Sequence, residues 1–245
     1  EGVFFNKIDL VSPSLDLGLC RGNISARHFE NKKFDLGSEY LYFHGAKASK
    51  EYDLWKMVYS DDIFNLALKN NSLNTICLVH VVDHFDKVEE AFQEVARVLK
   101  KGGKVYFSCI SEYHFESNPL ISLFKCFNRE NANLYIEYLA LKRTNFNYLS
   151  ENEWKKILED CGFVIEEFHF FLDGVFAYFR YFLHFTFFIN RCFDFDFLKK
   201  EPFERFSKKL FYFFYISIGY PAYLRVKRGE PKWGTDIFVS AKKTK

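Results

Sequence analysis

The sequence lacks several features that would place it in a familiar class at once. Its 34 basic and 32 acidic residues leave a formal charge of only +2, so no global charge draws it to nucleic acid. None of its six cysteines forms a Cys-x-x-Cys pair, and most stand in apolar runs, which favours reduced, buried thiols over a disulfide framework or a metal site. No signal-peptide pattern opens the chain. We therefore expect a cytoplasmic protein without a structural metal.

Short apolar runs alternate with helical patterns through the first half of the chain. The expected strands are 13–17, 33–38, 55–59, 74–80 and 104–109. A capping-box pattern at 86–89 opens a helix with one apolar face, and the Lys-Lys-Gly-Gly run at 100–103 ends it. This alternation of strand and helix predicts a parallel sheet with helices on both faces, in one α/β domain over 1–245.

The second half of the chain is less regular. Residues 110–149 are expected to form helices and a lid-like loop. Ser150–Glu153 is a second capping-box pattern, which opens a helix that ends near Gly162. Strands at 163–171 and 235–240 complete a sheet of seven strands.

An insertion at 174–234 separates the last two expected strands. It holds 21 of the chain's aromatic residues, with 11 basic residues against 5 acidic ones. Its apolar runs are too short and too often interrupted by charge to span a bilayer. A helical subdomain that packs its phenylalanines inward, a tunnel for a lipid-linked acceptor and a dimer interface are all compatible with it. The basic excess favours contact with an anionic membrane at its inner face, and disfavours nucleic acid.

The segment 15–22 is the most informative of the chain. An apolar strand leads into Asp16 and a turn with glycines at 18 and 22, and a helix-like run follows. Glycines in such a turn let the backbone pass close to a ligand at the start of a helix. Glu39 stands at the end of the second apolar run. This order of strand, turn, helix, strand and acid is typical of a site that binds the ribose of a nucleotide.

Together these motifs resemble the class I S-adenosylmethionine-dependent methyltransferases. The resemblance spans 10–172 and 235–243, and it is carried by the segments 16–22, 37–39, 60–62, 78–84, 94–103 and 148–163. It implies a Rossmann-like fold with a mostly parallel seven-stranded sheet. It also implies that the protein takes a methyl group from S-adenosylmethionine and releases S-adenosylhomocysteine.

The resemblance also implies roles for individual residues. The cofactor-binding set is Asp16, Gly18, Cys20, Gly22, Glu39, Asp61, Asp62 and Val79. The turn would hold the methionyl part, Glu39 would accept hydrogen bonds from the ribose hydroxyls, and Asp61 or Asp62 would lie beside the adenine. The sequence departs from the family at Cys20, where a glycine is usual, and at the bulky Arg21 beside it.

Methyl transfer needs alignment and exclusion of water more than covalent help from the protein. A hydroxyl acceptor would also need a general base, and His80 and His84 stand where the fourth strand ends. Alternatively, His80 is a residue of the pocket wall, and His84 orders its loop. Tyr113 and His114 are further candidates on the acceptor side.

The sequence leaves the acceptor open. A sugar hydroxyl in surface glycan synthesis is the first expectation, and a ring carbon of a quinone or another lipid is the second. A non-catalytic, membrane-associated scaffold on the same fold is the alternative from a different class, and Cys20 and Arg21 are the features that favour it.

Overall fold

The computed structural model describes residues 2–116, 121, 125–126, 128–144, 146–171 and 233–244. The chain divides into two compact units. The first comprises 1–111, 140–169 and 237–245, and the second comprises 112–139 and 170–236. The insertion expected at 174–234 lies outside the described residues, apart from 233 and 234.

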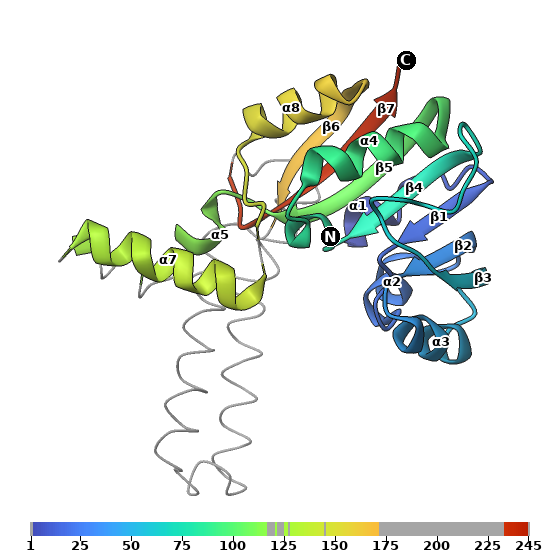
Figure 1. Cartoon of the computed structure of the whole chain (residues 1–245), viewed down its shortest axis with the longest axis horizontal. Coiled ribbons are helices and arrows are strands. Elements are labelled where there is room, and N and C mark those ends of the chain that lie inside the picture. The colour runs from blue at the N-terminus through green and yellow to red at the C-terminus, as the bar shows by residue number, and fades with distance from the viewer. Residues whose placement is uncertain are drawn as a thin grey trace, which may run out of the picture. The chain divides into compact units, whose positions relative to one another are not determined.

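A seven-stranded sheet forms the centre of the fold (Figure 1). Its strands are β1 (Ser14–Leu17), β2 (Phe34–Glu39), β3 (Trp55–Ser60), β4 (Leu73–Val79), β5 (Leu99–Ile110), β6 (Phe163–Phe171) and β7 (Asp236–Lys243). They are ordered β3-β2-β1-β4-β5-β7-β6, and the first five pair in parallel. Figure 1 shows β7 running opposite to β6. The expected sheet, mostly parallel and Rossmann-like, is confirmed.

The described helices precede or connect these strands along the chain. They are α1 (Gly2–Phe5), α2 (Asn23–His28), α3 (Tyr42–Glu51), the 3-10 turn η1 (Val82–His84), α4 (Val88–Val98), α5 (Tyr113–Glu116), α7 (Arg129–Arg143) and α8 (Glu151–Asp160). No helix in the described part of the chain is long and apolar enough to cross a membrane.

The two capping predictions had opposite outcomes. At α8 the pattern is confirmed: the Ser150 N–H donates to Glu153 Oε2 at 2.8 Å, and Ser150 Oγ accepts from the Glu153 N–H. Gly162 then takes the left-handed conformation (φ 85°) that ends the helix. At α4 the pattern was wrong. The N-cap is Lys87, one residue after Asp86, and within the described structure no side chain caps that end.

Helix α4 ends at Val98, just before the run 100–103, as expected. The chain turns extended at Leu99 (ψ 139°), and β5 begins there. Leu99 already pairs with Leu73, and a register irregularity between Leu73 and Thr75 accommodates the lysines and glycines. The pairs with β4 skip 100–103, where Gly102 takes a left-handed conformation (φ 81°), and regular pairing resumes at Lys104, where the strand was expected to begin.

Aromatic side chains fix the helices on opposite faces of the sheet. On β5, Tyr106 stacks with Phe238 at 6.4 Å between ring centroids, while its neighbour Phe107 meets Trp154 of α8 at 5.1 Å. Successive strand residues point to opposite faces, so these contacts define two separate layers of core. Phe92 joins α4 to the Phe107 layer, and Phe5 joins α1 to the Phe238 layer.

The cysteines only partly follow the expectation of buried thiols. Cys77 and Cys109 are buried, but Cys20 and Cys126 are exposed. Cys20 is exposed because it stands in the turn after β1, where the backbone opens toward a cavity.

Candidate functional site

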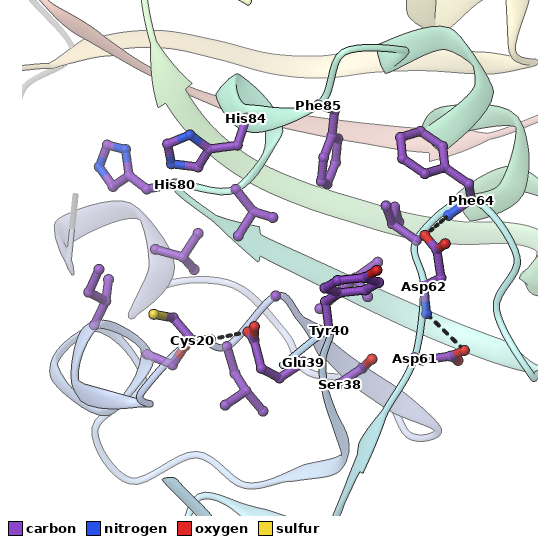
Figure 2. A pocket seen from close by; sticks show the side chains of 18 residues that line it. Cys20, Ser38, Glu39, Tyr40, Asp61, Asp62, Phe64, His80, His84 and Phe85 are labelled. Carbon is purple, nitrogen blue, oxygen red and sulfur yellow. Dashed lines mark hydrogen bonds between the residues drawn. The ribbon is translucent and has the colours of Figure 1, made fainter. Parts of the chain in front are cut away.

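A cavity of about 610 Å³ opens at the carboxyl ends of β1, β2 and β4, within the first unit (Figure 2). The chain order reverses here, because β1 has β2 on one side and β4 on the other. Open α/β sheets bind their ligands at such a switch point. Eight of the predicted site residues line the cavity: Gly18, Cys20, Glu39, Asp61, Asp62, Val79, His80 and His84.

The turn after β1 is built from left-handed residues. Gly18, Cys20 and Gly22 have φ values of 76°, 52° and 77°. A Cβ on Gly18 would lie 2.6 Å from Val81 Cγ1, so only glycine fits there without displacing the cavity wall. Cys20 takes a left-handed conformation with a side chain, which costs about 1–2 kcal/mol in L-residues.

Glu39 is held at the end of β2 by backbone donors. The Cys20 N–H donates to Oε2 at 2.7 Å, and the Leu41 N–H to Oε1 at 3.3 Å. An ionised carboxylate offers about four acceptor positions, so each oxygen keeps capacity for a further donor. The carboxylate is thereby oriented at the cavity wall.

The loop after β3 supplies one end of the cavity wall, where Figure 2 shows Asp61, Asp62 and Phe64. Asp61 accepts from the N–H groups of Asp62 and Ala67, at 3.0 and 2.9 Å. Asp62 Oδ1 accepts from the Phe64 N–H at 3.0 Å. Neither carboxylate begins a helix. The hydrogen bonds of Asp61 and Asp62 stabilise the loop, and both residues line the cavity.

Asp16 lies beneath the turn rather than in the cavity wall. It is 1% exposed, and the Trp55 indole N–H donates to its Oδ2 at 2.9 Å. Its Oδ1 is buried with no hydrogen-bond partner among the described residues. Burial raises the pKa of Asp16 to about 6, although hydrogen bonds from Ser25 and Trp55 oppose the rise. Gly22, the other predicted residue outside the wall, packs against the same Trp55 ring.

The two predicted histidines lie at one end of the cavity in Figure 2. His80 has a left-handed backbone (φ 51°), and its N–H donates to the Ser108 carbonyl at 3.0 Å. His84 is half-exposed, with Nδ1 3.0 Å from the Thr144 carbonyl oxygen. A carbonyl oxygen can only accept, so this hydrogen bond requires the proton on Nδ1 and leaves a lone pair on Nε2 in the neutral ring. Nε2 lies 3.8 Å from Asp83 Oδ2.

Three aromatic wall residues were missed by the sequence reasoning: Tyr40, Phe64 and Phe85. Their positions in the sequence could have indicated two of them, since Tyr40 directly follows Glu39 and Phe64 follows the Asp61-Asp62 pair. The rings of Phe64 and Phe85 meet edge to face, with centroids 6.1 Å apart. Arg21, in contrast, is exposed and stands outside the wall, so the bulkier of the two family departures leaves the cavity open.

The comparisons with known proteins agree with this geometry. Residues 15–107 match the family model of the methyltransferase domain. The chain carries a methyltransferase domain. The predicted resemblance to class I S-adenosylmethionine-dependent methyltransferases is thereby confirmed, and S-adenosylmethionine is the cofactor of that class.

Two curated relatives match part of this chain over part of their own length. The mitochondrial 2-methoxy-6-polyprenyl-1,4-benzoquinol methylase of Xenopus laevis is 27% identical over 125 residues, which cover 47% of this chain and 39% of the relative. Its Bos taurus counterpart is 28% identical over 111 residues, which cover 42% of this chain and 33% of the relative. The aligned part of the chain thus covers less than two fifths of the length of either relative.

Solved structures share the fold of the methyltransferase domain at low identity. An S-adenosylmethionine-dependent methyltransferase from Mesorhizobium loti has a TM-score of 0.56 at 15% identity, covering 96% of this chain and 94% of its own. Phosphoethanolamine N-methyltransferase 2 of Haemonchus contortus, in complex with S-adenosylmethionine, has a TM-score of 0.56 at 16% identity, covering 99% of this chain and 51% of its own. The [4+2]-cyclase SpnF also has a TM-score of 0.56, at 11% identity and with 99% and 80% coverage. The fold alone therefore does not decide the reaction.

The residues present fit S-adenosylmethionine. Glu39 offers acceptor positions for two hydroxyls, and the turn at 18–20 presents backbone at the wall. Glu39, Asp61 and Asp62 give the wall acidic character suited to a cationic sulfonium ligand. Among the described residues, no group of three or more potential ligands is placed to hold a metal ion.

Proposed function

We propose that this chain transfers a methyl group from S-adenosylmethionine to an aromatic, lipid-linked acceptor. The observation that carries the proposal is the cavity at the switch point of a methyltransferase domain, with the Glu39 carboxylate fixed in its wall by the Cys20 N–H. Histidines line one end of this cavity and Asp61, Asp62 and Phe64 line another (Figure 2). We assign the end lined by Asp61, Asp62 and Phe64 to the nucleoside of the cofactor, and the end lined by the histidines to the reaction.

At the nucleoside end, Glu39 accepts hydrogen bonds from the ribose hydroxyls, and the loop at 61–64 contacts the adenine. The backbone of the turn at 18–20 holds the methionyl part. When bound, S-adenosylmethionine supplies an electrophilic methyl group on a positively charged sulfur. The chain's contribution is alignment and the exclusion of water by the apolar wall residues, among them Val79, Val81 and Phe85.

At the reaction end, His84 is the general base. Its Nδ1–H is engaged by the Thr144 carbonyl, so the Nε2 lone pair is the one that takes a proton from a ring hydroxyl of the acceptor. The Asp83 carboxylate, 3.8 Å from Nε2, stabilises the imidazolium that results. A phenolate is a stronger nucleophile than the phenol, both at its oxygen and at the ring carbon beside it.

Relatives favour the second of the two expected acceptors. Both curated relatives are named as methylases of a polyprenyl benzoquinol, which is an aromatic ring on a lipid tail. Neither of these two relatives is named as acting on a sugar hydroxyl. The basic and aromatic composition of 174–234 suits a lipid-linked acceptor and contact with an anionic membrane. We expect the full chain to sediment with vesicles that contain phosphatidylglycerol, and to lose that binding as salt is raised. Equal recovery with neutral vesicles would contradict the preference for an anionic surface, and no recovery with either kind of vesicle would contradict the membrane contact.

The cofactor site is tested by calorimetric titration with S-adenosylmethionine and S-adenosylhomocysteine. Glu39→Ala should weaken both by about 10- to 100-fold, because hydrogen bonds to charged groups contribute about 1.5–3 kcal/mol. Glu51→Ala is the matched control, since Glu51 ends the adjacent helix α3 and forms an exposed ion pair with Lys47. A folded wild-type protein that binds neither ligand would favour the non-catalytic scaffold.

The acceptor is tested with S-adenosylmethionine that carries a labelled methyl group. A benzoquinol with a short polyprenyl tail should take up the label in the presence of the wild-type protein. A polyprenyl-linked sugar should not. Labelling of the sugar alone would restore the first expectation.

A further inference from the structure

We propose that Glu94 and Arg97 of α4 are a positioning pair that fixes the cofactor-side loop 61–72, and through it the nucleoside end of the cavity. The inference rests on the proposed function, because it assigns a role in binding the nucleoside of the cofactor. Neither residue lines the cavity formed by residues 17–85.

The loop needs an external anchor. Residues 61–72 join β3 to β4, and this fully described stretch contains no helix or strand beyond an isolated bridge between Asp62 and Asn65. Its first part nevertheless supplies Asp61, Asp62 and Phe64 to the cavity wall. Backbone groups in such a stretch must find partners outside regular secondary structure.

Arg97 supplies several of those partners. Its Nη1 donates to the Leu68 carbonyl at 2.8 Å and to Asn70 Oδ1 at 2.6 Å. Its Nη2 donates to the Leu66 carbonyl at 2.9 Å. A planar guanidinium can serve these three acceptors at fixed angles, whereas an ammonium cannot.

Glu94 completes the anchor from the same face of α4. Its two oxygens accept from Arg97 Nη2 and Nε at 2.6 and 2.7 Å, a bidentate pairing that orients the guanidinium. Oε1 also accepts the Leu66 N–H at 2.7 Å. Both backbone groups of Leu66 are therefore held by this pair. The helix that carries it is itself fixed by the buried side chains of Phe92 and Val95.

The anchor is connected to the cavity wall by short steps. Ala67, next to Leu66, donates its N–H to Asp61 Oδ2 at 2.9 Å. Phe64, two residues before Leu66, places its ring against Phe85 across the wall. Displacing Leu66 would thus move both the carboxylate and the ring that form the nucleoside end.

The test compares Arg97→Gln and Arg97→Lys with Lys87→Gln. Lys87, the N-cap of the same helix, pairs with Glu90, and both of those side chains are more than half exposed. The first readout is amide hydrogen exchange of Leu66 and Ala67 in the ligand-free protein. We expect faster exchange in both Arg97 variants and no change in the Lys87 variant. Unchanged exchange in Arg97→Gln would overturn the anchoring role, whatever the protein binds.

The second readout is calorimetric binding of S-adenosylhomocysteine and of 5′-methylthioadenosine. Both contain the adenosine, but only the first has the amino-acid part. We expect each Arg97 variant to weaken the two ligands by the same factor, about tenfold, which is the loss of about 1.4 kcal/mol. A loss confined to S-adenosylhomocysteine, or unaltered binding despite faster exchange, would overturn the nucleoside role while the proposed function stands. Failure of the wild-type protein to bind either ligand would instead remove the proposed function and this role together.

Discussion

The Cys20 N–H donates to Glu39 Oε2 at 2.7 Å and joins the turn after β1 to the end of β2. Cys20 can direct its N–H there because it adopts a left-handed backbone conformation, at a position where the methyltransferase family usually has glycine. The departure from the family motif therefore preserves the backbone geometry of the turn. It adds a thiol to the cavity wall, and some backbone strain.

Replacing Cys20 with glycine should relieve that strain. We expect Cys20→Gly to change the free energy of unfolding by no more than about 1 kcal/mol, in the stabilising direction, because the strain relieved exceeds the entropy lost. Cofactor affinity should be equal or higher. Urea unfolding and titration with S-adenosylhomocysteine measure the two effects.

Asn31→Gly is the matched control for this change. Asn31 also has a left-handed backbone (φ 62°), but it stands outside the residues that line the cavity. Because asparagine tolerates this conformation better than cysteine does, Asn31→Gly should change stability less, and it should leave binding unchanged. Weaker binding by Cys20→Gly would mean that the thiol itself contacts the cofactor.

The buried Asp16 should give stability a distinctive pH dependence. Burial raises the pKa of Asp16 from 3.8 to about 6, so the folded protein holds this proton more tightly than the unfolded chain does. The free energy of unfolding should therefore fall as pH rises from about 4 to about 6, by about 3 kcal/mol from this group alone. Asp16→Asn should remove that slope.

The measurement is urea unfolding of the wild type and Asp16→Asn across this pH range. Asp35 contributes with the opposite sign and in another window. Burial alone would raise its pKa, but hydrogen bonds from Lys56, Ser12 and Ser14 lower it, so its stabilisation is lost only below about pH 4. Parallel pH profiles for the two proteins would refute the assignment to Asp16.

Asn147 should be a strong determinant of the turn that carries His84. Its buried amide donates to the Val82 carbonyl at 2.9 Å and to the Phe85 carbonyl at 2.6 Å. Asn147→Ala would leave two carbonyls without these donors, and should lower the free energy of unfolding by about 2 kcal/mol. Asn131→Ala, at an exposed position, should change it by less than about 0.5 kcal/mol. Equal effects of the two variants in urea unfolding would contradict this role.

Local patterns predicted most of the framework of this fold. The first four strands appear at bounds that differ from the expected ones by a single residue at most, because each is a short apolar run bounded by polar residues or glycine. The turn at 16–22 and the acid at 39 were predicted as parts of one site, since parallel strands end at a common edge. The cavity wall contains Gly18, Cys20 and Glu39 as a result.

The remaining features depend on contacts between distant residues. Asp16 was expected to touch the cofactor, but Trp55, 39 residues away, holds it in the core. The segment 94–103 contributed to the family resemblance, yet the bonds from Arg97 to Leu66 and Leu68 cannot be inferred from a helical pattern. The start of β5 at Leu99, ahead of the expected start at 104, likewise depends on pairing with Leu73 of a distant strand. Local sequence preferences thus predict the helices and strands, whereas contacts between distant residues determine the positions of individual side chains.

One substitution can separate the proposed general-base role of His84 from its role in ordering the loop. Asparagine at this position has an amide N–H that can replace Nδ1–H as a donor to the Thr144 carbonyl, but it has no basic nitrogen in place of Nε2. We expect His84→Asn to keep cofactor affinity within about twofold and to lower kcat by about 10²- to 10⁴-fold, the usual contribution of a general base. Label transfer to the benzoquinol, with a parallel titration of S-adenosylhomocysteine, measures both quantities. If His84→Asn retains full activity and His84→Ala loses stability and activity together, the residue only orders its loop. His80, at the same end of the cavity, would then be the base to test.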